Sequence, residues 1–191
     1  MKVLLLCSDN PECEKLRSYI ISCGDELFYI TDKITSEKAR EINPDIMVSY
    51  NYRYILKPDV FSVPARGAIN LHISYLPWNR GADPNFWSHL DETPKGVTIH
   101  YIDFGIDTGD IIGQELVEFS DGDTLRSSYA KLHSAIQELF ERLWQKIKTR
   151  QVAPFKQQGE GTFHLSKDKE AFKHLVADKG HDTPIKEIKK F

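Results

Sequence analysis

The sequence has few cysteines and no long apolar run. These features argue against a disulfide-rich secreted protein and against a membrane-spanning one. The chain holds three cysteines, Cys7, Cys13 and Cys23, without a C-x-x-C pair. An odd, irregularly spaced set without a signal peptide predicts reduced thiols and a cytoplasmic protein. No apolar run approaches the ~20 residues that a membrane-spanning helix needs. We therefore expect no membrane partner.

The sequence also lacks an excess of basic residues. It carries 25 Lys and Arg against 28 Asp and Glu, which gives a formal net charge of −3. Proteins that bind nucleic acid neutralise phosphates with clustered Lys and Arg. The charge balance therefore gives no reason to expect a nucleic-acid partner.

Several motifs that would define a familiar site are missing. No G-x-G-x-x-G follows the first apolar run, which argues against a dinucleotide site, and no G-x-S-x-G is present for a serine hydrolase. A calcium loop beginning at Asp103 fails because its third, sixth and twelfth positions are Gly105, Thr108 and Gln114. No histidine pair at i, i+4 with a carboxylate base suggests zinc. We expect a site without a bound metal.

The first part of the chain alternates short apolar runs with helical patterns. Strands are predicted at residues 2–7, 26–31 and 45–50, and a short helix at residues 36–42. Such alternation predicts right-handed βαβ units and a mainly parallel sheet flanked by helices. We therefore expect a single α/β domain over residues 1–191.

The second part is predicted to hold one long helix and a small C-terminal extension. Apolar residues recur at helical spacing over residues 125–148. Residues 153–165 suggest a hairpin with a Gly-rich tip, and a short helix is expected at residues 170–175. We divide the domain into a core, residues 1–149, and an extension, residues 150–191.

The clearest chemical pattern lies within residues 67–114. A short apolar strand carries Asn70 and His72, and a second strand, residues 97–102, leads into a loop with three aspartates. Residues two apart on a strand point the same way, so Asn70 and His72 should project together, and the loop can bring Asp107 toward them. An amide donor, an imidazole and a carboxylate at strand ends suit the transfer of an acyl group to an amine.

These segments resemble the tetrahydrofolate-dependent formyltransferases. The family patterns Asn-x-His, Ser-x-Leu-Pro-x-x-(Arg)-Gly and an Asp-Thr-Gly-Asp-like loop are matched by residues 70–72, 74–81 and 106–110. The resemblance implies a Rossmann-like formyltransferase core that is shortened at its N-terminal side by about one βα unit. It also implies an enzyme that uses 10-formyltetrahydrofolate as its formyl donor.

The resemblance assigns catalytic roles to Asn70, His72 and Asp107. Asn70 would donate an N–H to the charge developing on the formyl oxygen, and His72 would accept a proton and later return it. Asp107 would hold His72 in its useful tautomer, although an aspartate between two glycines could instead only shape a turn. Asp103 and Asp110 compete for the carboxylate role, and the family register favours Asp107.

The resemblance also implies which residues line the ligand pockets. The loop after the third strand would form one wall of the folate pocket, although taken alone it could equally begin a helix. The predicted cofactor-binding residues are Tyr50, Asn51, Tyr52, Ile55, Asp103 and Gly105. For the acceptor, Arg80 suits a phosphate and Trp78 a sugar or base, with a surface loop clamped by Trp78 as the alternative. The predicted substrate-binding residues are Ser74, Trp78, Asn79, Arg80 and Gly81.

The whole chain is similar to two kinds of small family member. One kind formylates UDP-linked 4-amino-4,6-dideoxy sugars in pseudaminic-acid-type pathways, and the other is the formylation domain of linear gramicidin synthetase. A free-standing chain that ends at Phe191 favours the sugar enzyme. We therefore expect N-formyl transfer to a nucleotide-linked amino sugar for surface glycans, by a protein that could act as a homodimer. Formylation of a carrier-bound aminoacyl group and a non-catalytic folate-binding module stay open as alternatives.

Overall fold

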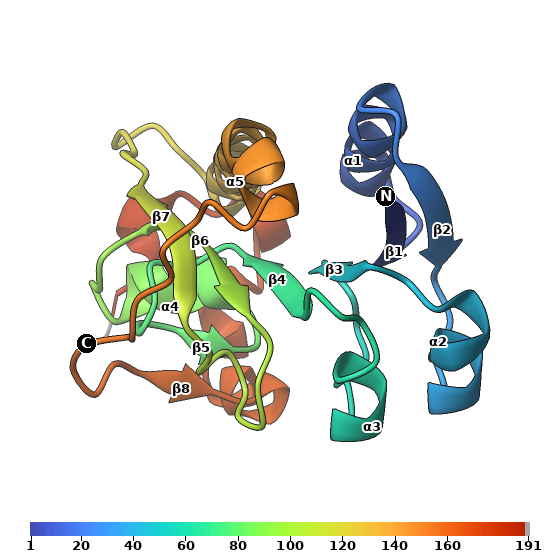
Figure 1. Ribbon diagram of the computed structural model, residues 1–191. Helices are drawn as coiled ribbons and strands as arrows, with labels where there is room; N and C mark the ends of the chain where they lie inside the picture. Colours follow the sequence, from blue (N-terminus) through green and yellow to red (C-terminus); the bar gives the residue numbers. More distant parts are fainter. Residues whose placement is uncertain (190–191) are drawn as a thin grey trace.

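The centre of the protein is a six-stranded sheet with the strand order β2-β1-β3-β4-β6-β7. The structure is a computed structural model that describes residues 1–189 (Figure 1). The strands of the sheet are β1 (Lys2–Cys7), β2 (Glu26–Ile30), β3 (Ile46–Tyr50), β4 (Ala68–His72), β6 (Gly96–Tyr101) and β7 (Ile111–Leu116).

The sheet is parallel in its first half and antiparallel at one end. Strands β2, β1, β3 and β4 pair in parallel, whereas β6 and β7 join in antiparallel fashion. Strands β1 and β3 are buried almost throughout, as expected for continuous apolar runs covered on both faces. The predicted α/β fold with a mainly parallel sheet is confirmed.

Helices cover both faces of the sheet, and alternate residues of β1 serve the two cores. Helices α1 and α5 lie on one face of the sheet and α2 and α3 on the other (Figure 1). Val3 and Leu5 pack with apolar residues of α1 and α5, whereas Leu4 and Leu6 pack with those of α2 and α3. This division follows from the two-residue period of a strand. The helices are α1 (Pro11–Ser22), α2 (Ser36–Ile42), α3 (Pro58–Phe61), α4 (Pro84–Leu90) and α5 (Leu125–Lys148).

The long helix α5 spans the predicted residues and links the core to the site. It begins at a capping box, in which Thr124 and Ser127 each accept a hydrogen bond from the other's backbone N–H. Its apolar face buries Phe140 and Trp144 completely, and burying such a side chain stabilises by about 2–3 kcal/mol. The helix is thereby fixed in place, so that residues of its first half can face a ligand.

The C-terminal extension does not form the predicted hairpin. Phe155 makes an isolated antiparallel bridge with Ile111, and β8 (Phe163–His164) pairs in parallel with β5 (Arg80–Gly81). The prediction was wrong because the loop after β4 offers unpaired backbone groups, and the extension bonds to these instead of to itself. Residues 80–81, expected to be loop, are therefore a short strand. The expected helix is a longer 3₁₀ segment, η1 (Ser166–Val176), followed by η2 (Gly180–Asp182) and η3 (Ile185–Glu187).

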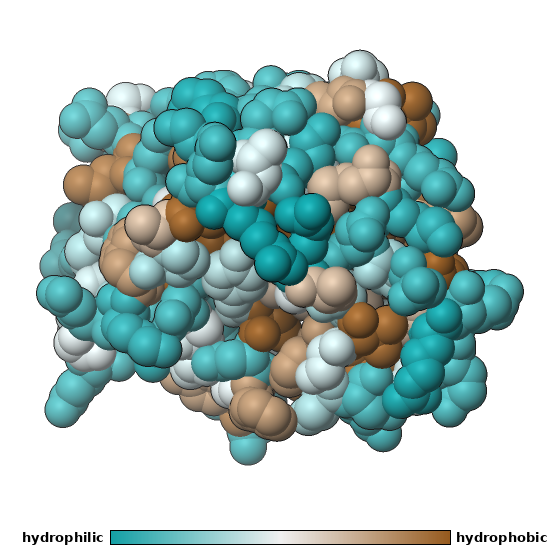
Figure 2. All heavy atoms as spheres, viewed as in Figure 1, coloured by the Kyte–Doolittle hydropathy of each residue, from teal (hydrophilic) through white to brown (hydrophobic). Residues whose placement is uncertain are grey.

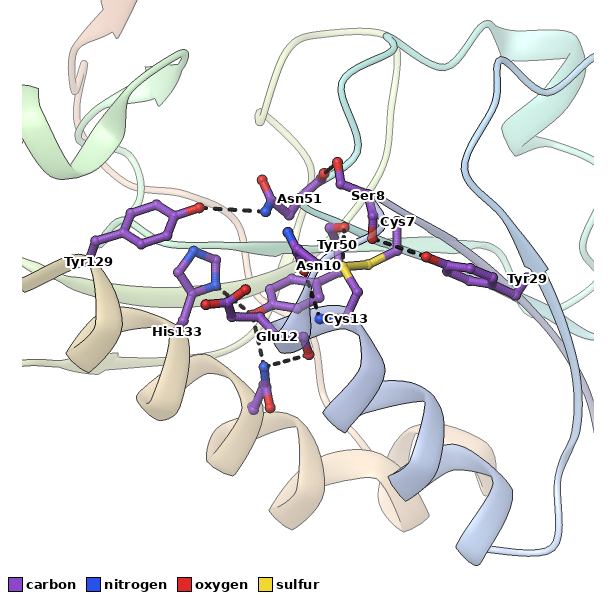
Figure 3. The surroundings of a disulfide bond; sticks show 11 residues. Cys7, Ser8, Asn10, Glu12, Cys13, Tyr29, Tyr50, Asn51, Tyr129 and His133 are labelled. Atoms are coloured by element: carbon purple, nitrogen blue, oxygen red, sulfur yellow. Dashed lines mark hydrogen bonds between the residues drawn. A yellow bond between two sulfur atoms is a disulfide. The ribbon is translucent and has the colours of Figure 1, made fainter. Parts of the chain in front are cut away.

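The cysteines also differ from the expectation of reduced thiols. Cys7 at the end of β1 and Cys13 in the first turn of α1 form a disulfide, while Cys23 is free (Figure 3). Their Cα atoms lie 6.2 Å apart, within the usual range for such a bond. The strand-to-helix turn brings the two cysteines together, which their spacing in the sequence did not indicate.

The outer surface is mixed in polarity. Figure 2 shows brown hydrophobic patches separated by teal hydrophilic residues on the face drawn in Figure 1. No helix within residues 1–189 is long and apolar enough to cross a membrane.

Candidate active site

A cavity of about 730 Å³ lies along the strand ends of the sheet and holds the predicted chemical residues. Such a volume is in the range of small-molecule sites. It is lined by loop residues after β3 and β6, by residues 81–84 and 163–166, and by Tyr129 and His133 in the first half of α5. Asn70, His72 and Asp107 line the same cavity. Open α/β sheets bind ligands at this edge.

The structure brings Asn70, His72 and Asp107 together, although 37 residues separate the first from the last. The Asn70 side-chain amide donates to Asp107 Oδ1 at 3.2 Å, and His72 Nδ1 lies 3.7 Å from Asp107 Oδ2. The Gly81 N–H donates to the same Oδ2 at 2.8 Å. Asp107 adopts a φ of 53°, which the short Asp side chain tolerates. It thus shapes its turn and also holds the neighbouring polar groups.

The tautomer of His72 follows from its second nitrogen. His72 Nε2 lies 3.1 Å from the carbonyl oxygen of Asn79. A carbonyl only accepts hydrogen bonds, so Nε2 carries the proton in the neutral ring. His72 Nδ1 then presents its lone pair on the side of Asp107, which makes this atom the candidate proton acceptor.

His100 is part of the cluster, and the sequence reasoning missed it. It lies on β6 directly opposite Asn70 in the strand register. Its Nδ1 donates to the Tyr101 carbonyl at 2.8 Å, and its Nε2 lies 3.3 Å from the Asn70 amide nitrogen and 3.4 Å from Asp107 Oδ1. The signal in the sequence is a histidine two residues after Thr98, on the same face of a strand whose other residues are mostly apolar.

Asp107 is ionised in this setting. Burial alone would raise the pKa of its carboxyl group, but His72, His100 and the Gly81 N–H outweigh that effect and hold the pKa well below its ordinary value. Among residues 1–189, no group of three or more His, Cys, Asp or Glu side chains is arranged to hold a metal ion. The carboxylate of Asp107 faces the Asn70 amide, the Gly81 N–H and two histidine rings.

Gln157, from the C-terminal extension, holds the loop of Asp107 in place. Its side-chain NH₂ donates to the carbonyl oxygens of Asp107 at 2.8 Å and Gly109 at 2.9 Å. Its Oε1 accepts from Arg80 Nη2 at 2.8 Å and Nε at 3.1 Å. Sequence reasoning gave no signal for this contact, because it expected residues around Gln157 to pair with one another.

All six residues predicted to bind the cofactor line the cavity, although several also have other contacts. The Tyr50 ring is fully buried and its hydroxyl faces α5, and Tyr52 donates its hydroxyl to the Asp32 carbonyl. Asp103 accepts hydrogen bonds from within its own loop. The lining residues from this set are Tyr50, Asn51, Tyr52, Ile55, Asp103 and Gly105.

The residues predicted to bind the acceptor are divided. Gly81 lines the cavity. The Asn79 side chain donates to Thr93, and the Ser74 hydroxyl donates to the Trp78 carbonyl. Arg80 contacts Gln157. The four predicted residues that do not line the cavity are therefore Ser74, Trp78, Asn79 and Arg80. Their contact with a substrate stays a prediction.

The fold and the site define a class of protein. Residues 30–143 match the family described as "Formyl transferase", and the chain belongs to this family. It is an enzyme that transfers formyl groups.

Solved structures extend the match to the whole chain. The formyltransferase PseJ from Anoxybacillus kamchatkensis, in complex with UDP-4,6-dideoxy-4-formamido-L-AltNAc and tetrahydrofolate, is 45% identical. The match covers 98% of this chain and 97% of that one, with a TM-score of 0.91. An N-formyltransferase from Helicobacter canadensis with folinic acid and dTDP-3-aminofucose is 25% identical over 88% of this chain and 72% of its own, with a TM-score of 0.74. Methionyl-tRNA formyltransferase from Clostridium thermocellum shares the fold at 19% identity, with a TM-score of 0.72 over 90% and 75% of the two chains.

Proposed function

We propose that the protein transfers the formyl group of 10-formyltetrahydrofolate to the amine of a UDP-linked 4-amino-4,6-dideoxy sugar, in surface-glycan biosynthesis of the pseudaminic-acid type. The observation that carries this proposal is the 45% identity to PseJ over 98% of the chain. That relative was solved with the formylated UDP-sugar and with tetrahydrofolate. The combination of a nucleotide-linked amino sugar and a folate therefore defines the expected substrate pair.

The cavity fits a folate on the side formed by residues 51–56 and 102–106. Ile55 is 75% exposed and Phe104 is 85% exposed, which is unusual for large apolar side chains unless a ligand or partner covers them. We expect the flat pterin ring to lie between these two loops. Asp103, Gly105 and Ile55 would then contact the folate.

The residues at the centre of the cavity suit the chemistry. When bound, 10-formyltetrahydrofolate supplies the formyl carbon. The acceptor amine attacks this carbon, so a new C–N bond forms as the carbon's bond to the folate nitrogen breaks. The amine loses one proton and the folate nitrogen gains one, and His72 Nδ1 is the group that accepts and returns it.

Asn70 and Asp107 support this transfer. Asn70 turns one N–H from its present partners toward the formyl oxygen, where negative charge develops. Asp107 stays ionised and stabilises the positive charge of protonated His72. The removal of one donor of this kind typically raises the barrier by about 3 kcal/mol.

The experiment is a transfer assay with the UDP-linked 4-amino sugar as the acceptor and UDP as a competitor. Purified protein, 10-formyltetrahydrofolate and the UDP-linked 4-amino sugar should give tetrahydrofolate and the formamido sugar in equal amounts, measured by mass spectrometry. UDP should compete with the acceptor with a Kd of about 1 mM or lower, which corresponds to roughly 4 kcal/mol of binding. Arg80→Ala tests the predicted phosphate contact. If Arg80 binds the phosphate, the acceptor KM of this variant should be higher than that of wild type.

Two other outcomes would replace the proposal. Transfer to a carrier-bound aminoacyl group, without inhibition by UDP, would assign the chain to peptide formylation. Folate binding without transfer to any amine would assign a binding module. A homodimer and a cytoplasmic location also stay predictions, which light scattering and cell fractionation would check.

A further inference from the structure

His133 on α5 has a ring nitrogen without a hydrogen-bond partner among the described residues. The residue is only 4% exposed, and Nε2 is the atom without a partner. His133 also lines the cavity. Leaving a buried polar atom unpaired costs about 1–3 kcal/mol, so the atom is expected to find a partner when the cavity is filled.

Three neighbours decide which nitrogen of His133 carries the proton. The Gln137 side-chain NH₂ donates to the Glu12 carbonyl at 2.9 Å and to the Tyr50 hydroxyl at 3.0 Å (Figure 3). The Tyr50 hydroxyl thus receives one hydrogen bond and uses its own hydrogen toward His133 Nδ1, 2.5 Å away. Nδ1 is then the acceptor, and Nε2 carries the proton. The free atom is an N–H donor.

The donor lies where the first half of α5 meets the start of the loop after β3, because Asn51 donates to the Tyr129 hydroxyl at 3.5 Å (Figure 3). Tyr129, one turn earlier on α5, lies with its ring centre 4.1 Å from that of His133 (Figure 3). Tyr129, His133 and residues 81–84 line the same cavity. This segment begins at Gly81, which holds Asp107. If folate lies between residues 52–56 and 102–106, the part of the cavity beside His133 and residues 81–84 is left for the acceptor.

We propose that the Nε2–H of His133 binds an uncharged oxygen of the acceptor sugar, a hydroxyl or an amide carbonyl, and so determines acceptor specificity. This inference rests on the proposed function. Burial lowers the pKa of His133 to about 4, so the ring is neutral at pH 7. A neutral, rigidly held donor suits a neutral sugar oxygen, whereas a diphosphate is better met by a cation.

The test compares two substitutions at His133 in the full chain. His133→Leu removes the donor, and His133→Gln keeps an N–H near the position of Nε2. We expect His133→Leu to raise the acceptor KM about tenfold, with kcat and the KM for 10-formyltetrahydrofolate within threefold of wild type. His133→Gln should recover most of the acceptor affinity. Loss of one neutral hydrogen bond to a ligand has effects of this size.

His89 provides a matched control. It is also a buried histidine with an unpartnered Nε2 and a pKa lowered to about 4 by burial, but it does not line the cavity. His89→Leu should leave the acceptor KM unchanged. If His133→Leu does not fold, Tyr50→Phe decides instead, because it removes the hydroxyl that fixes the tautomer and should raise the acceptor KM by a smaller factor.

Three results would overturn the inference while leaving the proposed function intact. The first is an unchanged acceptor KM in His133→Leu. The second is a rise in the KM for 10-formyltetrahydrofolate, and not for the acceptor, in the same variant. The third is an equal rise in the acceptor KM in His89→Leu. A wild-type enzyme that fails to formylate any UDP-linked amino sugar would instead contradict the proposed function. The wild-type assay is therefore run first.

Discussion

Two buried aspartates, Asp107 and Asp25, show how similar electrostatics can serve different ends. Both have a pKa below the ordinary value, in each case because hydrogen bonds and nearby charges outweigh the effect of burial. Asp25 accepts hydrogen bonds from Lys148 Nζ at 3.0 Å, Trp144 Nε1 at 2.9 Å and the amino group of Met1 at 3.0 Å. Asp107 instead has an amide, a backbone N–H and two histidines.

The partners of the two carboxylates explain the difference. The charge of Asp25 is matched by two cations, Lys148 and the amino group of Met1, and the contact with Lys148 ties the sheet to the end of α5. Asp107 lies beside imidazoles that can gain a proton, and it lines the cavity. A lowered pKa therefore does not identify a catalytic carboxylate by itself, but protonatable partners and access to a cavity do.

The largest expected effect is on activity at Asp107. Asp107→Asn keeps the shape and tolerates the positive φ, but it removes the charge that stabilises protonated His72. We expect formyl transfer to fall at least a hundredfold, with a melting temperature within a few degrees of wild type. Formyl transfer by Asn70→Ala and by His72→Asn should fall by a similar factor.

Asp110→Asn is the matched control, because Asp110 lies on the same loop and pairs with Lys156 at the surface. Its activity should stay within twofold of wild type. Near-normal turnover in a folded Asp107→Asn protein would remove the distinction between the two buried aspartates.

The next largest effect is on stability at Asp25. Asp25→Asn leaves Lys148 without its buried partner, and we expect the free energy of unfolding to fall by about 3 kcal/mol in urea titrations. The kcat of the folded fraction should not change. Asp182→Asn breaks an exposed pair with Arg126 and should cost less than about 1 kcal/mol. If the free energy of unfolding falls equally in Asp25→Asn and Asp182→Asn, the burial of Asp25 does not strengthen its contribution to stability.

Gln157 should have a smaller effect on the chemistry. Gln157→Glu keeps the shape and the acceptor for Arg80 but loses both N–H donors to the Asp107 loop. We expect kcat to fall about tenfold, or ~1.4 kcal/mol of barrier, with both KM values within twofold. The adjacent exposed residue offers a control, Gln158→Leu, which should behave as wild type. A rise in KM without a change in kcat would show that Gln157 acts on binding instead.

The smallest expected effect is the pH dependence of stability. Because the pKa of Asp25 is lowered in the folded state, its contribution is present above the ordinary Asp pKa of ~3.8 and is lost as pH falls through that range. Wild type should therefore lose stability faster than Asp25→Asn between about pH 5 and pH 3. Parallel curves from chemical denaturation would contradict this assignment.

Much of the fold could be predicted because its signals are local. The continuous apolar run of β1, the helical stripe of α5 and the alternation between them depend on residues close in sequence. The end of the chain could not be predicted in this way. Residues 153–165 have good turn chemistry, but their hydrogen-bond partners are Ile111 and residues 80–81.

By itself, the sequence determined which polar residues share a face of the strand at the centre of the site, and their catalytic roles are predictions. Asn70 and His72 are two residues apart on a strand, so any sheet that buries this strand points them the same way, and their motif brought the folate-dependent reaction with it. Only the tertiary structure decided what surrounds them. His100, Gln157 and His133 contact residues of the site that lie 30, 50 and 83 positions away in the sequence, namely Asn70, Asp107 and Tyr50. Their places depend on the packing of β6, the C-terminal extension and α5 against the sheet, which leaves no periodic signal along the chain.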